Sequence, residues 1–355
     1  MSAPALAPAA WPRAKPLEEL LLHLDPAQGT VRDRRFGELP ELLEPGDALV
    51  VNDAATLPAS VPARVNGASA EIRLLEELGD GEWMAVVFGP GDWRTRTESR
   101  AAPPRVREGQ SVVVAGLDAE VQHVSPLSPR LVQLKFHAGP DAFWNAIYRH
   151  GRPIQYAHLA AELPLWHVQT SYAARPWAVE MPSAGRPLRW SQLLQLRRQG
   201  ISVVSLTHAA GLSSTGDAAL DGALPLAEHF EIPQATAEAI SQAKRSGGRV
   251  VAVGTTVVRA LEGSFAQRGH LLASAGRTDL RIGPGFRPKV VDGLLTGIHE
   301  RGTSHFELTQ AFASAGLLER AQAHAAARGY LSHEFGDSML ILGSKHHSEF
   351  AASAE

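Results

Sequence analysis

The sequence of 355 residues contains no cysteine. This excludes disulfides, thiol catalysis and cysteine-ligated metals, and it is typical of a reducing compartment, so we expect a cytoplasmic protein. No run of about 18 apolar residues occurs, so we expect no segment to cross a membrane. Neither sign of charge dominates, because 34 Lys and Arg stand against 37 Asp and Glu. Without a global basic field, a nucleic acid could bind only to a local patch.

The chain is long enough for more than one domain, since single hydrophobic cores usually split beyond about 250–300 residues. Hydrophobic residues make up 44% of it, which is ample for a core. The Ala- and Pro-rich residues 1–16 lack the pattern of a signal peptide, and we expect them and residues 344–355 to be disordered tails. We expect the paired His346 and His347 to be solvent-exposed and not to bind a metal.

A series of short β-like runs begins after residue 61, with Gly, Pro and charged turns between most of them and no helical pattern. The runs are residues 70–75, 83–88, 111–115, 119–124 and 131–136. This pattern predicts a small antiparallel β-barrel or sandwich over residues 61–137. We expect it to be inserted into a discontinuous main domain formed by residues 17–60 and 138–343.

In the main domain, strand and helix patterns alternate. We predict strands at residues 48–51, 201–206, 250–253, 290–295 and 339–342, and helices at 141–150, 192–199, 235–246, 257–262, 306–313 and 317–327. Such alternation predicts an α/β domain with a mostly parallel sheet. Asp141, Ser191 and Ser304 stand where they could cap three of these helices, Ser304 through a Ser-x-x-Glu capping box.

Gly254, Thr255 and Thr256 stand between a predicted strand and a predicted helix. Their hydroxyl and N–H groups could hold a carboxylate or a ribose, or the threonines could simply cap the helix. Arg259, one turn further on, could bind an anion or pair with Glu262. The spacing alone leaves both pairs of alternatives open.

Three histidines stand in positions suited to catalysis. His299 and His305 flank a Gly-Thr-Ser segment, and a histidine on such a loop can act as a base or an acid near neutral pH, a role we predict for His299. The six-residue spacing does not match a helical pair of zinc ligands, so we predict no metal site. His208 follows a predicted strand and precedes residues 209–217, which are rich in small hydroxyl residues and form either a ligand loop or a flexible turn.

Two further segments carry polar or small residues after extended stretches. Asn52 and Asp53 follow a buried strand and could bind a ribose, hold a proton acceptor or stabilise a turn. Residues 180–185 contain Ser183 and Gly185, which permit close approach of a backbone. The aromatic side chains of Tyr172 and Trp177 nearby could stack on a base or pack in the core.

Taken in order, these segments resemble the QueA family, the S-adenosylmethionine:tRNA ribosyltransferase-isomerases of queuosine biosynthesis. The resemblance runs from about residue 30 to 343 and is strongest at residues 46–53, 57–59, 168–173, 182–185, 249–262, 291–299 and 336–341. It implies an α/β domain with an inserted β-barrel, in agreement with the pattern of strands and helices.

The resemblance also implies a reaction. Family enzymes transfer the ribosyl part of S-adenosylmethionine to a 7-aminomethyl-7-deazaguanine base in tRNA, with release of adenine and methionine. The sulfonium acidifies the C5′ protons, so a modest base suffices and no metal or redox cofactor is required. We expect His299, His208 and Asp53 to be catalytic and the chain to be a monomer. The residues expected to bind S-adenosylmethionine are Asn52, Ser183, Gly185, Gly254, Thr255, Thr256, Arg259 and Asp337.

The sequence departs from the family pattern where substrate should lie. The family's Asn-Asp-Thr-Arg loses its Arg at residues 52–55, its Pro-Thr-Ala-Gly-Leu-His-Phe loses its His at 182–188, and further changes fall at 207–215, 224–228 and 297–301. We therefore expect a divergent paralogue that acts on tRNA or on another acceptor. The alternatives are a catalytically silent nucleotide- or RNA-binding protein and a histidine-dependent hydrolase, although no nucleophile motif supports the latter.

Overall fold

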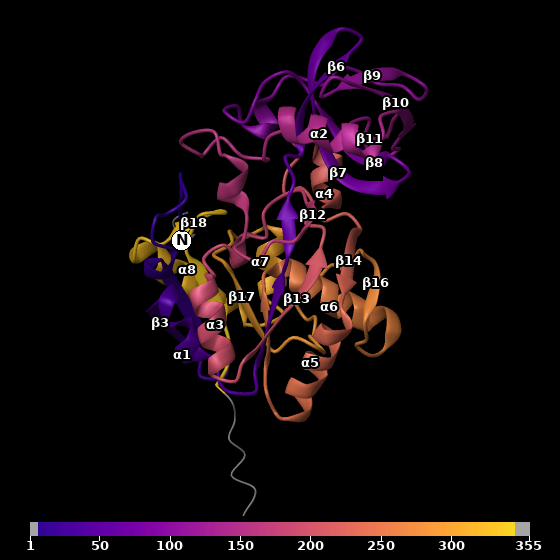
Figure 1. The fold of residues 1–355 in the computed structure, drawn as a ribbon. Coiled ribbons are helices and arrows are strands. Elements are labelled where there is room, and N and C mark those ends of the chain that lie inside the picture. The colour runs from indigo at the N-terminus through magenta and orange to yellow at the C-terminus, as the bar shows by residue number, and fades with distance from the viewer. Residues whose placement is uncertain (1–5, 345–355) are drawn as a thin grey trace, which may run out of the picture.

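The structure is a computed structural model that describes residues 6–344 (Figure 1). A β-barrel lies at one end of the molecule and an α/β domain at the other, joined by several chain crossings. The predicted fold class is confirmed. His346, His347 and all but the first residue of the predicted second tail lie outside the described residues.

A nine-stranded mixed sheet forms the centre of the α/β domain. The strand order is β16-β14-β13-β4-β15-β17-β19-β2-β3. The four strands β13, β4, β15 and β17 are parallel to one another. β14 pairs antiparallel with β13, β19 pairs antiparallel with β17, and β16 at the edge pairs antiparallel with β14. The bounds are β2 Leu20–Asp25, β3 Thr30–Arg35, β4 Ala48–Asn52, β13 Ser202–His208, β14 Glu228–Ile232, β15 Val250–Val253, β16 Ser274–Thr278, β17 Gly293–Gly297 and β19 Ser338–Ile341.

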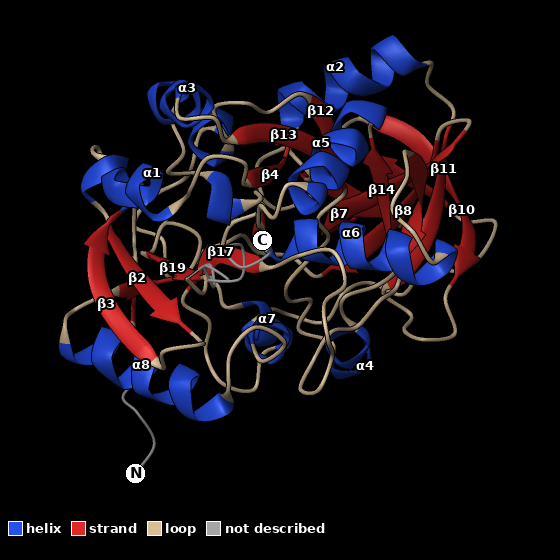
Figure 2. Cartoon of the chain, turned by 90° about the horizontal axis from the view of Figure 1, so that it is seen from below, coloured by secondary structure: helices blue, strands red, loops and turns tan. Residues whose placement is uncertain are grey.

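Helices cover both faces of this sheet because its strands are apolar on both sides. On one face α5 (Gln234–Arg245) and α6 (Thr255–Arg268) pack on side chains such as Val50 and Ala252, and α8 (Ala315–Ala327) packs on others such as Leu24 and Ile341. On the other, α1 (Leu39–Leu42) and α3 (Trp190–Arg198) pack on their alternating neighbours, such as Val51 and Leu295. Figure 2 shows α8 and α1 on opposite sides of β2 and β3.

The barrel is closed and antiparallel, in the order β10-β11-β8-β7-β6-β9. Its strands are β6 Ser60–Val65, β7 Ala68–Gly79, β8 Glu82–Phe88, β9 Ser111–Val114, β10 Leu117–Val124 and β11 Leu131–Phe136. The helix that follows, α2 (Pro140–His150), inserts Phe143 and Ile147 into the barrel core, where Phe143 stacks on Trp83 at 5.2 Å between ring centroids. The barrel thus has a filled interior.

The segment after β13 joins the barrel to the sheet. It contains α4 (Ala218–Ala223), and its Leu212 and Leu220 are buried in the barrel core. Ser128 of the barrel donates a hydrogen bond to Asp217 at 2.9 Å, and Asp217 also caps α4. This loop therefore holds the barrel close to the edge of the sheet where β13 ends.

Several local predictions were wrong. Residues 6–16 are ordered, because β1 (Ala7–Pro8) pairs with β18 (Leu331–Ser332) and Arg13 forms an ion pair with Asp337. The residues at the N-caps of α2, α3 and α7 (Ser304–Thr309) are Gly139, Arg189 and Thr303, in place of Asp141, Ser191 and Ser304. Only Thr303 among them caps with its side chain, which accepts the N–H of Phe306.

The remaining elements are small. A two-stranded parallel sheet pairs β12 (Arg175–Ala178) with β5 (Ala54–Thr56), just beyond the end of β4. Within residues 6–344, none of the helices combines the length and apolar character that crossing a membrane requires.

A polar network at the carboxyl ends of the parallel strands

The carboxyl ends of the four parallel strands meet at one edge of the sheet. Asn52 ends β4, His208 ends β13, Gly254 follows β15 and Gly297 ends β17. Ligands bind α/β proteins at this edge, where the strand order changes direction. Here β13 lies on one side of β4 and β15 on the other, so the strand order changes direction at β4 and this edge is a candidate site.

The side chain of Asn52 links the chain segments that meet at this edge. Its Oδ1 accepts the N–H of His208 at 2.9 Å and of Ala54 at 3.1 Å, and its Nδ2 donates to the carbonyl of His208 at 3.0 Å and to Thr256 Oγ1 at 3.3 Å. Every hydrogen-bonding atom of this buried amide is thereby in use. Asn52 therefore joins β4, β13 and α6, and it has no free group for a ribose.

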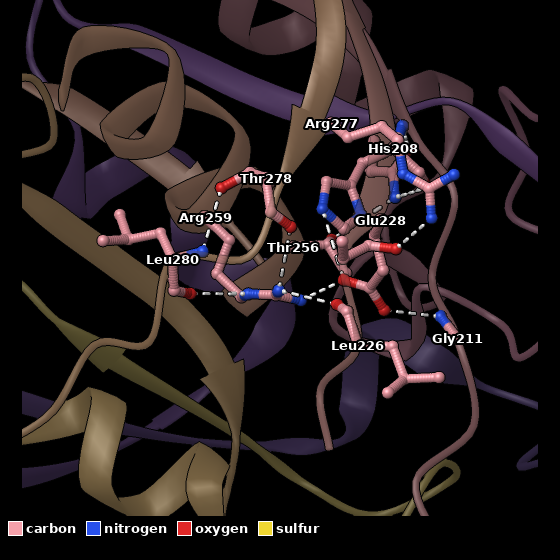
Figure 3. A network of polar contacts seen from close by, with 11 residues as sticks. His208, Gly211, Leu226, Glu228, Thr256, Arg259, Arg277, Thr278 and Leu280 are labelled. Carbon is pink, nitrogen blue, oxygen red and sulfur yellow. Dashed lines mark hydrogen bonds and ion pairs between the residues drawn. The ribbon is translucent and has the colours of Figure 1, made fainter. Parts of the chain in front are cut away.

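A buried ion pair lies beside the hydrogen bonds of Asn52 (Figure 3). Arg259 on α6 pairs with Glu228 on β14, and the two side chains are only 8% and 11% exposed. The guanidinium also donates to the carbonyls of Leu280 at 3.1 Å and of Leu226 and Thr278 at 3.4 Å. Neither alternative predicted for Arg259 describes this arrangement, because its charge is balanced by Glu228 and not by Glu262.

Glu262 instead accepts hydrogen bonds from the backbone. Its two carboxylate oxygens accept the N–H groups of residues 289, 290 and 291 at 2.9 Å, immediately before β17. From the middle of α6 it therefore holds the segment that leads into β17, away from the first turn of the helix that faces the candidate site.

His208 completes the network. Its side chain is fully buried, and its Nε2 lies 3.4 Å from Glu228 Oε2. This contact is long, and neither ring nitrogen has a hydrogen-bond partner among the described residues. Burial, with a smaller effect of the Arg259 charge, lowers the pKa of His208 well below its ordinary value of 6.5. The imidazole is therefore neutral near pH 7 and has a nitrogen free to accept a proton.

Burial also dominates the pKa of Glu228, which is raised above its ordinary value of 4.5 although the Arg259 guanidinium acts to lower it. The carboxylate is held further by the N–H of Gly211, which donates to Oε1 at 2.8 Å. Glu228 thus connects the loop after β13 to α6 and places a carboxylate beside the histidine.

The first turn of α6 faces the same edge. Gly254 stands at its N-cap with φ +94°, and no side chain caps the helix. A Cβ at Gly254 would lie 3.6 Å from Cβ of Ala184, so the segment with Ser183 and Gly185 packs beside this turn. Thr255 and Thr256 are the first two helical residues, and neither of them is a side-chain cap. Their N–H groups are those that can bind an anion at a helix N-terminus.

His299 and His305 lie together on the β17 side of the edge. Their rings stack at 5.0 Å between centroids with an interplanar angle of 22°, and His299 Nε2 contacts Thr296 Oγ1 at 2.7 Å. Burial lowers the pKa of both imidazoles, that of His299 well below its ordinary value, and the Arg259 charge contributes for His305. Both are neutral near pH 7, but His299 already has a hydrogen-bond partner.

Two of the predicted residues lie outside this cluster. Asp53 accepts hydrogen bonds from Ser205 and Thr207 at 2.8 and 2.7 Å and lines a separate groove of about 400 Å³ between α3 and α5. Asp337 is buried and accepts the N–H groups of Leu20 and Leu331, each at 2.8 Å, in addition to Arg13. The contacts of Asp337 are structural.

A cavity of about 220 Å³ lies between the barrel and the network. Glu228, His229 and Arg277 line its polar part, and Arg277 pairs with Glu76 of β7 at 2.8 Å across the two domains. Its apolar wall comes from the barrel and from the loop after β13, through residues such as Leu75, Met84, Val86, Leu131, Leu212, Leu220, Leu224 and Leu226. The size suits one ring of a ligand, because whole-ligand pockets measure about 300–1,000 Å³.

Glu228 and this cavity were missed by the sequence predictions. β14 was not predicted, although Phe230 and Ile232 alternate with polar residues on it in the period-two pattern of a strand. That alternation was a signal that could have placed Glu228 at a strand start. The cavity had no such signal, because its walls come from segments more than a hundred residues apart.

An α/β domain with an inserted barrel over a polar edge of its sheet is the kind of two-domain arrangement in which enzymes often have a site at the domain interface. A family model described as queuosine biosynthesis protein matches residues 3–341. An S-adenosylmethionine:tRNA ribosyltransferase-isomerase of Thermosynechococcus vestitus is 35% identical over 90% of this chain and 88% of its own, and one of Thermus thermophilus is 36% identical over 88% and 89%.

A crystal structure of S-adenosylmethionine tRNA ribosyltransferase from Thermotoga maritima is 27% identical, covers 96% of this chain and 99% of its own, and superposes with a TM-score of 0.54. The chain belongs to the queuosine biosynthesis protein family. The resemblance noted from the sequence is confirmed.

Proposed function

We propose that this chain is a transferase-isomerase that uses S-adenosylmethionine as a ribosyl donor and a 7-aminomethyl-7-deazaguanine base in tRNA as the acceptor. Adenine and methionine would be released. Relatives with this name match the chain over about 90% of its length, which supports the proposal. The site would work in the cytoplasm, where tRNA is modified.

The observation that carries the proposed chemistry is the state of His208. It is a buried, neutral imidazole without a hydrogen-bond partner among residues 6–344, beside the carboxylate of Glu228. The sulfonium of S-adenosylmethionine acidifies its C5′ protons, so a neutral imidazole is a sufficient base. Burial disfavours the imidazolium that proton transfer would form, and Glu228 Oε2, 3.4 Å from His208 Nε2, is the group placed to offset that cost. We therefore assign the base to His208 ahead of His299, whose Nε2 is occupied by Thr296.

The remaining parts of the donor have complementary surroundings. The first-turn N–H groups at Thr255 and Thr256 suit the methionine carboxylate, and the apolar cavity beside Glu228 suits the adenine ring. Gly254 would permit the backbone to approach the ligand closely, whereas the Tyr172 hydroxyl fills the space beside Gly185. Ser183 precedes Ala184, whose Cβ lies beside Gly254 in this turn, and it is proposed to contact the donor.

The test combines binding and product analysis. S-adenosylmethionine is titrated calorimetrically into wild type and His208→Gln, and each protein is then incubated with the donor and with tRNA that carries the aminomethyl base. We expect wild type to release adenine. We expect His208→Gln to bind the donor and to react about 10²–10⁴-fold more slowly. His270→Gln, an exposed histidine at the end of α6, is the matched control and should match wild type.

Each other outcome has a defined meaning. An unchanged rate for His208→Gln removes the base assignment but keeps the overall reaction. Failure of wild type to bind the donor removes the reaction itself. Donor binding without adenine release on any tRNA would identify a catalytically silent paralogue. One observation favours that second candidate: Asn52 and Arg259, both expected to bind the ligand, are fully engaged within the protein.

A further inference from the structure

Three side chains with metal-binding atoms that are not part of the polar network described above converge at one place. They are His158, in the loop that follows α2, and His333 and Glu334, in the turn between β18 and β19. One ligand atom from each lies within 4.8 Å of the other two. Among residues 6–344, no other group of three such side chains comes together in this way.

The arrangement is close to that of a four-coordinate site. His158 Nε2 lies 3.1 Å from Glu334 Oε2, and the two imidazoles stack at 4.4 Å between centroids with an interplanar angle of 29°. Ligands about 2.0–2.1 Å from a tetrahedral zinc ion are roughly 3.3 Å apart. The histidine–glutamate edge, at 3.1 Å, is close to this length, and the two edges to His333 are at most 4.8 Å. His333 is exposed and is the ring with room to adjust.

The backbone under these side chains is held by packing. Leu159, which follows His158, and Phe335, which follows Glu334, are buried in the same small apolar cluster. The N–H of Gly336 donates to the carbonyl of His333 at 2.9 Å, and His333 adopts φ +67°, a conformation uncommon outside glycine. The three ligands are therefore presented by two segments fixed against each other, as a prepared site requires.

A comparison within the chain separates this cluster from an ordinary histidine–carboxylate contact. His324 contacts Asp33 at 2.9 Å, but that carboxylate is also bonded by Arg328 and Tyr330, and a second imidazole is not part of the group. Glu334 has His158 as its side-chain partner and carries no arginine or lysine in its ion pair. The negative charge at Glu334 is thus left for a cation.

We propose that His158, His333 and Glu334 bind a divalent transition-metal ion of the zinc class, with two imidazole nitrogens, one carboxylate oxygen and a position open to water. Imidazole ligands select zinc, cobalt or nickel over magnesium and calcium, which prefer oxygen. The site does not depend on the proposed ribosyl transfer. It does lie near His299, since a positive charge on His333 contributes to the lowered pKa of His299.

The test uses the full chain after chelator treatment, with Zn²⁺ alone as the titrant in calorimetry and Co²⁺ as a spectroscopic probe. The variants remove a ligand while keeping the local structure. His158→Phe retains the ring stack, His333→Asn tolerates a positive φ, and Glu334→Gln is isosteric. His324→Phe, at the lone histidine–carboxylate pair, is the matched control.

We expect wild type and the control to bind one equivalent of Zn²⁺ and to give the visible absorption of four-coordinate Co²⁺. Each of the three variants should bind at least about tenfold more weakly and lose that absorption. Absence of stoichiometric binding by wild type would overturn the proposal, as would binding of unchanged affinity in the three variants. Circular dichroism of each variant shows that a loss of binding is not a loss of fold.

Discussion

Replacing Glu228 by Gln tests whether the buried ion pair stabilises the site. Gln keeps the size of the side chain and an oxygen for the N–H of Gly211, but it removes the only carboxylate paired with Arg259 in the described residues. The guanidinium, 8% exposed, would retain three carbonyl partners and no counter-charge. Breaking a buried pair in this way costs about 3–5 kcal/mol of unfolding free energy.

The assay is urea unfolding of wild type, Glu228→Gln, Arg259→Met and the double variant. Because Arg259→Met removes the stranded charge, the double variant should lose less than the sum of the single variants, with a coupling of about 2 kcal/mol or more. Glu231→Gln is the matched control on the same strand. Its pair with Arg175 is 34% and 44% exposed, so its loss should cost at most about 1 kcal/mol.

Two results would refute this reasoning. The first is a cost for Glu228→Gln no larger than that of the surface control. The second is additivity of the two single variants, which would mean that the charges do not act on each other.

Three further changes test other parts of the structure. The pKa of His208 is lower in the folded chain, so below about pH 6.5 the unfolded chain binds a proton that the folded chain does not. The unfolding free energy should therefore fall by about 1.4 kcal/mol for each unit by which the pH is lowered. Urea titrations at several pH values should show a shallower fall for His208→Gln than for wild type. Gly185→Ala would place a Cβ 1.9 Å from the Tyr172 hydroxyl and should cost about 1–3 kcal/mol, whereas Gly283→Ala, with no atom within 4 Å, should leave the melting temperature unchanged. Asp337→Ala leaves two backbone N–H groups unpaired, so limited proteolysis should cut residues 6–16 faster than in wild type, and equal rates would contradict the role of this carboxylate.

Much of the fold was predictable because its signals are local. The strands at residues 250–253 and 339–342 differ from the observed β15 and β19 by at most one residue at each end, since a short apolar run between turns specifies a strand without reference to its neighbours. Five of the six barrel strands were predicted in the same way, but β6 was missed. β14 was missed although its apolar residues alternate, and β16 was missed because it has no large apolar side chain. The caps of α2, α3 and α7 were misplaced by one or two residues.

The candidate site was predictable only in outline. Residue type and position after a strand brought Asn52, His208, Thr256 and Arg259 to one edge, as the parallel arrangement requires. Which of them is free to react depends on partners far away in the chain. Glu228, 31 residues before Arg259, neutralises its charge, and no spacing rule points to such a pair.

The sequence by itself determined the family, the alternation of strands and helices and the identity of the groups at the strand ends, because each depends on residues that are close together in the chain. Tertiary structure alone decided their chemical state. Burial makes His208 neutral, and the hydrogen bonds of Asn52 give that side chain a structural role. The fold brings His158 to within 3.1 Å of Glu334, which is 176 positions away in the chain. Protonation, pairing and coordination depend on what surrounds a side chain, and only the folded chain supplies those surroundings.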